Sequence, residues 1–134
     1  MTDAISKPRI LIVEDDLENQ KFLRVFLRKT FEIQICDSSE SFYAKLNQFD
    51  FDVILMDISL RGSKDGFELT KELRVNPKYK DIAVVGLSAH AFQKDIENAY
   101  ASGIDIFVTK PVHGNLLMDS LKSALEKRAG IKLS

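Results

Sequence analysis

Acidic residues stand directly after the first aliphatic run of the chain, which reads Ile-Leu-Ile-Val over 10–13. Three carboxylates follow that run, from Glu14, Asp15 and Asp16. Like charges at the end of a buried element repel one another and resist desolvation. A bound cation would remove this repulsion, and carboxylate oxygens are ligands that Mg²⁺ prefers. The alternative is a capping cluster at the start of a helix, where acidic residues are favoured.

Three further polar residues follow later aliphatic runs in the same way. Asp57 ends the run VILM, Ser88 follows VVGL, and Lys110 follows FVT. A carboxylate, a hydroxyl and an amine beside an acidic pair suit phosphoryl transfer, in which positioning and charge neutralisation carry most of the catalysis. Asp57 would be the nucleophile and form an aspartyl phosphate. Lys110 would neutralise the phosphoryl group, and Ser88 would donate a hydrogen bond to it.

These residues need elements that bring them to one place. Five short runs rich in β-branched residues predict strands, over 10–13, 31–35, 53–56, 82–87 and 106–108. Segments with apolar residues at helical spacing alternate with the strands. This order indicates an α/β fold, a doubly wound parallel sheet of the (βα)₅ type, in which ligands bind beyond the carboxyl ends of the strands.

The helical segments are expected to bury the apolar positions that recur on one face. These positions are Phe22, Val25, Phe26, Phe42, Leu46, Phe49, Phe67, Leu69, Leu73, Val75, Ile96, Ala99, Tyr100, Leu116, Leu117, Leu121, Ala124 and Leu125.

Composition fits a single globular domain. The chain has 134 residues, 45% of them hydrophobic and 29% charged, which is enough to bury one core. A net charge of −1 gives no general attraction to nucleic acid or to anionic membranes, and no apolar run is long enough to span a bilayer. The single cysteine, Cys36, is expected to be a buried thiol. A single cysteine cannot form a disulfide within the chain, and the N-terminus lacks a signal-peptide pattern. Both observations favour a location in the cytoplasm.

Four short motifs, each at the end of its own predicted strand, together resemble the receiver domain of response regulators, the CheY-like family. They are VEDD at 13–16, LMDISL at 55–60, LSA at 87–89 and VTKP at 108–111. The resemblance covers residues 8–128 and leaves 1–7 as a disordered N-terminus and 129–134 as a C-terminal tail. It implies a flavodoxin-like sheet with strand order 2-1-3-4-5. The chain would be a stand-alone receiver or one excised from a longer protein.

The resemblance also assigns roles to individual residues. It implies that Asp57 accepts a phosphoryl group from a sensor histidine kinase or a histidine phosphotransfer protein. The Mg²⁺ ligands that it implies are Glu14, Asp15, Asp57 and the backbone carbonyl of Ser59, with Mn²⁺ as an alternative ion. Asp16 matches no ligand position and is interpreted as a helix cap. The peptide bond between Lys110 and Pro111 would be cis.

A phosphorylation-dependent switch is a further implication of the family. Ser88 would move to bond the phosphoryl group, and Phe107 would turn inward to fill the vacated space. The surface of the fourth helix, fifth strand and fifth helix would then change shape and control a downstream protein target. The chain would act as a monomer or as a phosphorylation-linked dimer. Its own phosphorylation and dephosphorylation would be its only chemistry, so it would not be a turnover enzyme.

Some residues depart from the commonest family pattern. The loop SLRGSKDG at 59–66 lacks the usual proline and is one residue longer. Ser88 stands where threonine is frequent, and Phe107 offers no hydroxyl to a partner. The stretch LSAHAFQKD at 87–95 is more similar to receivers of hybrid sensor kinases, which favours a phosphorelay. His90 could tune dephosphorylation, although a half-exposed histidine at a helix start is the simpler interpretation.

Other functions share this type of sheet. A flavodoxin-like flavin carrier needs a Ser/Thr/Gly phosphate cradle in the first loop, which is acidic here. A phosphatase of the haloacid-dehalogenase type needs a second acid two residues after its nucleophile, where this chain has Ser59. A phosphorylation-independent pseudo-receiver, which would act as an adaptor, is the open alternative to the phosphoacceptor.

Overall fold

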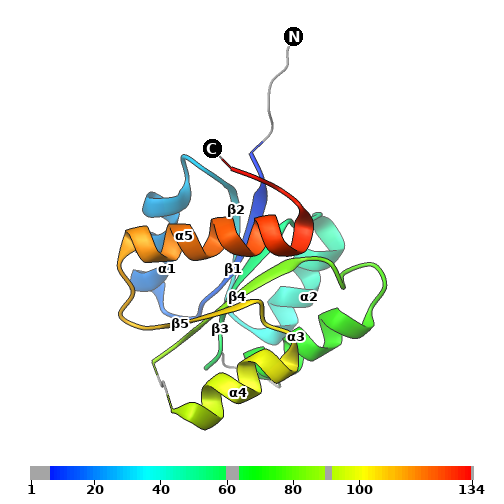
Figure 1. The fold of residues 1–134 in the computed structure, drawn as a ribbon. Helices are drawn as coiled ribbons and strands as arrows, with labels where there is room; N and C mark the ends of the chain where they lie inside the picture. The colour runs from blue at the N-terminus through cyan, green and yellow to red at the C-terminus, as the bar shows by residue number, and fades with distance from the viewer. Residues whose placement is uncertain (1–6, 60–63, 90–91, 134) are drawn as a thin grey trace.

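Five parallel strands form one sheet in the computed structural model, which describes residues 7–59, 64–89 and 92–133. The strand order is β2-β1-β3-β4-β5, so the predicted fold class and sheet order are confirmed (Figure 1). The strands are β1 (Arg9–Val13), β2 (Glu32–Cys36), β3 (Val53–Asp57), β4 (Ala83–Ser88) and β5 (Ile106–Thr109).

Helices alternate with the strands and cover both faces of the sheet (Figure 1). They are α1 (Leu17–Leu27), α2 (Ser39–Gln48), α3 (Gly66–Val75), α4 (Gln93–Ser102) and α5 (Gly114–Ala124), with a short π-helical turn η1 (Leu125–Ala129) after α5. The buried side chains form two clusters, one on each face. Helices α2, α3 and α4 contribute to one cluster, and α1 and α5 contribute to the other.

Alternate residues of the central strands point into opposite clusters. In β1, Leu11 and Val13 belong to the α2–α4 cluster, whereas Ile10 and Ile12 belong to the α1–α5 cluster, and none is more than 1% exposed. Because both faces are covered, the strand reads as an unbroken aliphatic run. In β3 the single polar residue is Asp57. It is the last residue of the strand and lies at the carboxyl edge of the sheet.

Local signals set where the helices begin and end. Asp16 caps α1 by accepting a hydrogen bond from the amide of Glu18, as predicted. Asp65 and Glu68 form a reciprocal capping box at the start of α3. Helix α4 ends at Gly103, whose φ of 106° is the left-handed conformation that favours glycine.

The buried helix faces were predicted only in part. Five residues expected in the core are between 51% and 82% exposed, namely Phe22, Val25, Val75, Tyr100 and Leu116. In α1 the buried residues are Leu23 and Leu27. The segment from 22 to 27 holds five apolar residues, so its spacing fits two adjacent helix faces, and packing against the sheet selects one of them.

Both ends of the described chain contact the domain. Lys7 donates a hydrogen bond from Nζ to the carbonyl of Arg28, at 3.1 Å. At the other end, Gly130 stops η1 with a φ of 69°. Ile131 and Leu133 then pack against the α1–α5 cluster. Of the N-terminal segment predicted to be disordered, 1–7, the structure describes Lys7, and residues 1–6 lie outside the described residues.

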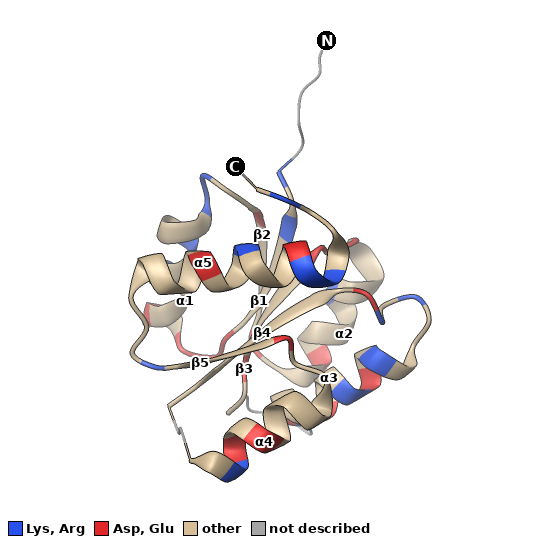
Figure 2. Cartoon of the chain, in the orientation of Figure 1, with Lys and Arg blue, Asp and Glu red and all other residues tan. Residues whose placement is uncertain are grey.

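Charged residues of both signs are interspersed over the helices (Figure 2). This mixture agrees with the net charge of −1. Within the described ranges, no helix combines the length and the apolar character that a membrane crossing requires.

An ion-pair network centred on the buried carboxylate of Asp105 stabilises the amino edge of the sheet. Asp105 precedes β5, and its side chain is 4% exposed. One carboxylate oxygen accepts from Arg74 Nη2 at 3.1 Å and from the amide of Val84 at 2.8 Å, and the other accepts from Arg128 Nε at 2.9 Å. Arg74 also donates to the carbonyl of Gly103 at 2.9 Å. The network joins α3 and η1 to β4 and to the start of β5.

We expect Asp105→Ala to lower the free energy of unfolding by about 3–5 kcal/mol, because it leaves the largely buried Arg74 guanidinium, whose side chain is 14% exposed, without its carboxylate. Urea unfolding measures the change. The matched control is Asp119→Ala, an exposed position on α5 where we expect a change within about 0.5 kcal/mol. A loss below about 1 kcal/mol for Asp105→Ala would place this network among weak surface pairs.

Candidate functional site

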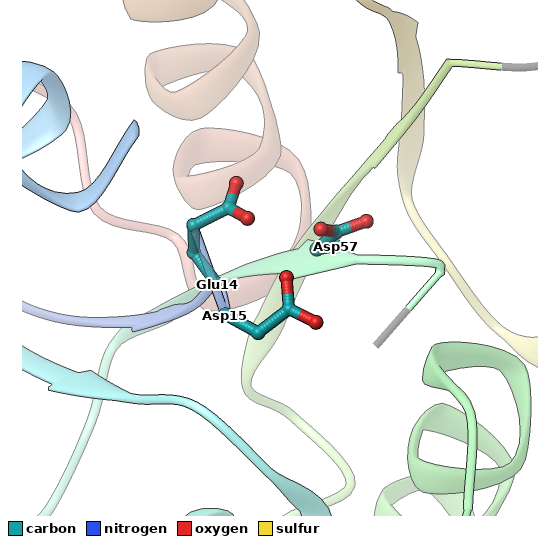
Figure 3. Close-up of side chains that lie close together, drawn as sticks. All are labelled: Glu14, Asp15 and Asp57. Atoms are coloured by element: carbon teal, nitrogen blue, oxygen red, sulfur yellow. The ribbon is translucent and has the colours of Figure 1, made fainter. Parts of the chain in front are cut away.

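Three carboxylates meet at the carboxyl edge of the sheet. Strands β1 and β3 are neighbours, with Val13 paired to Met56, so the residues that follow each strand lie side by side. One carboxylate oxygen each from Glu14, Asp15 and Asp57 lies within 4.8 Å of the other two (Figure 3). Glu14 and Asp57 are buried, at 2% and 5% exposure, and Asp15 is half-buried. The residues predicted to bind a metal are thus brought together.

Lys110 supplies positive charge to the same place. Its amide donates to the carbonyl of Ser88 at 2.8 Å, which fixes the end of β5 against the end of β4. Its Nζ lies 3.3 Å from Glu14 Oε1 and 3.3 Å from Asp57 Oδ2. One ammonium therefore bridges carboxylates from two different strands. The peptide bond between Lys110 and Pro111 is cis.

Burial and neighbouring charges shift the pKa of two groups at the site. Burial raises the pKa of Glu14, and the Asp57 carboxylate raises it further, while the amide of Asp16 and the ammonium of Lys110 oppose the shift. For Lys110, burial alone lowers the pKa, but the carboxylates of Asp57 and Glu14 outweigh it and raise the pKa above its ordinary value. The ammonium form is thus stabilised, and a bound cation would relieve the remaining repulsion between carboxylates.

Hydrogen bonds hold Glu14 in place. Its amide donates to the carbonyl of Cys36 at 3.0 Å, and its Oε2 accepts from the amide of Asp16 at 3.2 Å. Its backbone carbonyl accepts from Gln20 Nε2 at 2.6 Å. Sequence reasoning missed Gln20, because a single amide on a helix carries no signal in its spacing.

Close packing surrounds Asp57. The amide of Ser59 donates to Asp57 Oδ1 at 3.0 Å. Gly66 begins α3 against the end of β3, and a Cβ at that position would lie 3.0 Å from the carbonyl oxygen of Asp57. Only a residue without a side chain fits there unless the backbone shifts. Metal binding by the carbonyl of Ser59 stays a prediction, and residues 60–63 of the longer loop lie outside the described residues.

The two predicted switch residues lie on adjacent strands. Ser88 ends β4 and is 3% exposed. Asp57 is paired in register with Leu87, so Ser88 lies one residue beyond it on the next strand. Phe107 is half-buried on β5 and packs against the α2–α4 cluster, and its amide donates to the hydroxyl of Tyr100 at 3.3 Å. The movement of Ser88 and Phe107 stays a prediction, and His90 lies outside the described residues.

An apolar pocket of about 380 Å³ adjoins the site. Its polar side is formed by Glu14 and Lys110, and its apolar wall includes Phe22, Leu87 and Pro111. Phe22 was predicted to lie in the core, and its exposure instead gives the site an apolar border.

The acidic cluster fits a hard divalent cation. It offers oxygen ligands from three carboxylates, which is the donor chemistry that Mg²⁺ selects in proteins. Glu14, Asp15 and Asp57 are the residues that would hold the ion. Lys110 is an ammonium and cannot be a ligand.

The chain matches the response regulator receiver domain family over residues 10–122. It therefore belongs to that family, whose receiver domains take part in two-component signalling.

The proteins similar in sequence to this chain include some that are much longer. The heme response regulator HssR of Staphylococcus saprophyticus is 33% identical over 118 residues, which make up 87% of this chain and 51% of that protein. Hybrid signal transduction histidine kinase I of Dictyostelium discoideum is 32% identical over 128 residues, which make up 89% of this chain and 7% of that protein. The chain thus spans about half or less of these relatives.

Solved structures show the same fold. The receiver domain of a sensor histidine kinase from Pseudomonas aeruginosa PAO1 is 26% identical, with a TM-score of 0.78 over 94% of this chain and 100% of that chain. That structure has a magnesium ion coordinated in the active site cleft. The signal receiver domain of a histidine kinase from Syntrophus aciditrophicus is also 26% identical, with a TM-score of 0.82 over 95% of this chain and 94% of that chain.

Cys36 lies next to this site but is not part of it. The residue ends β2 and is 4% exposed, which confirms the predicted buried thiol. Burial, together with the carboxylate of Asp37, raises the pKa of the thiol to about 12. The reactive thiolate is therefore scarce at neutral pH.

We expect the protein to lose stability as the pH rises above about 9, because the unfolded thiol loses its proton while the native thiol keeps it up to a pKa of about 12. The native state then binds more protons than the unfolded state. The free energy of unfolding falls by at most about 1.4 kcal/mol per pH unit from this group. Urea unfolding at pH values of about 8, 9 and 10 measures the slope. Cys36→Ala removes the group, so an equally steep slope in that variant would contradict this assignment.

Proposed function

We infer that this chain is the phosphoacceptor of a two-component system or phosphorelay, and that Asp57 receives the phosphoryl group. The observation that carries this proposal is the contact of Lys110 Nζ with the carboxylates of Asp57 and Glu14, beside the half-buried Asp15. A nucleophile, a cation and an acidic pair converge on one edge of a rigid sheet. The donor is a phosphohistidine of a sensor histidine kinase or of a histidine phosphotransfer protein.

Transfer is a substitution at phosphorus. An oxygen of the Asp57 carboxylate forms a bond to phosphorus while the bond from phosphorus to the donor imidazole nitrogen breaks. The imidazole keeps the electron pair and takes a proton from solvent. Lys110 offsets the charge on the phosphoryl oxygens from its position against Asp57, and Ser88 donates a hydrogen bond. Water later hydrolyses the acyl phosphate, which releases inorganic phosphate and restores Asp57. In this proposal the phosphorylation and dephosphorylation of the chain itself are its only chemistry, so it acts as a signalling protein and not as a turnover enzyme.

The proposal includes Mg²⁺ bound by Glu14, Asp15 and Asp57, with the backbone carbonyl of Ser59 as a further ligand. When bound, the ion supplies positive charge for the phosphoryl oxygens. The three convergent carboxylates support this, as does the magnesium ion in the similar receiver domain from Pseudomonas aeruginosa. Mn²⁺, which also accepts oxygen ligands, is an alternative ion.

A change of surface carries the signal to a downstream protein. Ser88 and Phe107 lie on β4 and β5, next to the face formed by α4, β5 and α5. Phosphorylation of Asp57 draws Ser88 toward the phosphoryl group, and Phe107 turns inward. The protein target recognises the altered face, on a monomer or a phosphorylation-linked dimer. The complete set of Glu14, Asp15, Asp57 and Lys110 supports this function over a pseudo-receiver that works without phosphorylation.

We expect Asp57→Asn to abolish phosphorylation, because an amide cannot act as the nucleophile. Intact mass after incubation with acetyl phosphate, with and without Mg²⁺, measures the gain of one phosphoryl group. Asp50→Asn makes the same chemical change at an exposed position and should be labelled like the wild type. Full labelling of Asp57→Asn would overturn the assignment of the nucleophile.

A wild type that gains no mass would next be tested for Mg²⁺-dependent binding of beryllofluoride, which mimics the phosphoryl group. Binding would indicate a receiver that accepts only from a protein donor. Failure of both tests would favour the pseudo-receiver.

We expect Lys110→Ala to keep Mg²⁺ affinity near or above that of the wild type, because the lysine is no ligand and its removal leaves the carboxylates more negative. The variant should nevertheless lose the response of β5 and α4 to beryllofluoride. Amide chemical shifts of the isotopically labelled protein, measured by NMR, follow this response residue by residue. Lys71→Ala, an exposed position on α3, is the matched control and should respond fully. A normal response in Lys110→Ala would remove this residue from the switch.

A further inference from the structure

Gln20 lies on α1, outside the set of residues proposed above to contact the phosphoryl group or the metal. Its side-chain amide donates to the backbone carbonyl of Glu14 with an Nε2–O distance of 2.6 Å. We propose that Gln20 is a positioning residue that orients Glu14 and Asp15 for Mg²⁺ through this hydrogen bond. The inference rests on the proposed function of the site.

The backbone carbonyl of Glu14 lies one residue beyond the end of β1. Strand β2 ends at Cys36, whose carbonyl accepts from the amide of Glu14. Beyond that point the amides of Asp37 and Ser38 donate to Ser41 Oγ, at 3.1 and 3.0 Å, and start α2. The backbone of β2 thus turns away, and a side chain from α1 provides the donor that a longer strand would have provided.

The bonded carbonyl belongs to the peptide unit that joins Glu14 to Asp15. Because this unit is planar, fixing its oxygen fixes the direction in which the chain enters Asp15. This one hydrogen bond therefore acts on both residues of the acidic pair. The side chain of Glu14 also holds this turn, because its Oε2 accepts a hydrogen bond from the backbone amide of Asp16 at 3.2 Å.

The donor itself stands on a rigid support. Gln20 is half-buried, and its helix is anchored in the core by Leu23 and Leu27, which are 4% and 0% exposed. The backbone amide of Gln20 donates to the backbone carbonyl of Asp16 at 3.0 Å in the first turn of the helix. Ligands held by such outer contacts commonly lose about 10–100-fold in metal affinity when the contact is removed.

The test measures Mg²⁺ binding by isothermal titration calorimetry in the wild type and in Gln20→Met, which keeps the length of the side chain but has no donor. Gln48→Met makes the same change at an exposed position of α2 and is the matched control. Gln20→Asn, which keeps the amide but shortens its reach, is the second variant. Melting temperature without metal and the rate of labelling by acetyl phosphate at limiting and saturating Mg²⁺ complete the measurements.

We expect the Mg²⁺ dissociation constant of Gln20→Met to rise about tenfold, and that of Gln48→Met to stay unchanged. The labelling rate should fall at limiting Mg²⁺ and return to the wild-type value at saturation, with little change in melting temperature. A general structural role would instead lower the melting temperature and the saturated rate together, and would overturn the proposal. Wild-type affinity in both Gln20 variants would overturn it too, while leaving the phosphoacceptor intact. Failure of the wild type itself to bind Mg²⁺ would overturn the proposed function as well.

Discussion

Two buried carboxylates at the ends of neighbouring strands share one ammonium, and the rest of the site depends on this arrangement. Glu14 and Asp57 are almost inaccessible to water, so their charges need partners within the protein. Lys110 contacts both. When all groups are ionised, the three carboxylates and the one ammonium leave two negative charges, which is the charge that a divalent cation neutralises. A phosphoryl group adds negative charge at the same place, so the lysine and the acidic cluster act as one electrostatic unit.

The parallel sheet makes this unit. Neighbouring strands pair in parallel register, so residues far apart in sequence reach the same edge of the sheet. The aliphatic runs fix that register because one face of each central strand packs under α2–α4 and the other under α1 and α5. Different parts of each strand therefore serve stability and chemistry. The aliphatic residues hold the layers together, and polar residues at the carboxyl ends of β1, β3 and β5 form the site.

This division explains what could be predicted from sequence. The strands and the convergence of Glu14, Asp15, Asp57 and Lys110 were predicted from the aliphatic runs and the polar residues that follow them. The sheet order was predicted from the resemblance to the receiver family. The buried face of α1 did not follow, since apolar residues occupy two adjacent faces of that helix. The Asp105 network and the Gln20 contact were also missed. Each joins side chains to groups that only the folded chain brings near, with no local periodicity to reveal them.

Tyr100 has a consequence for self-association. β5 is an edge strand, and the free amides of an edge strand are a template on which another chain can add a strand. The Tyr100 hydroxyl already accepts the amide hydrogen of Phe107, in the middle of that edge. An incoming strand would have to displace the tyrosine before it could pair there. An exposed aromatic residue thus occupies one of the amides at which a further strand could pair with β5, even though it lies outside the core that its spacing suggested.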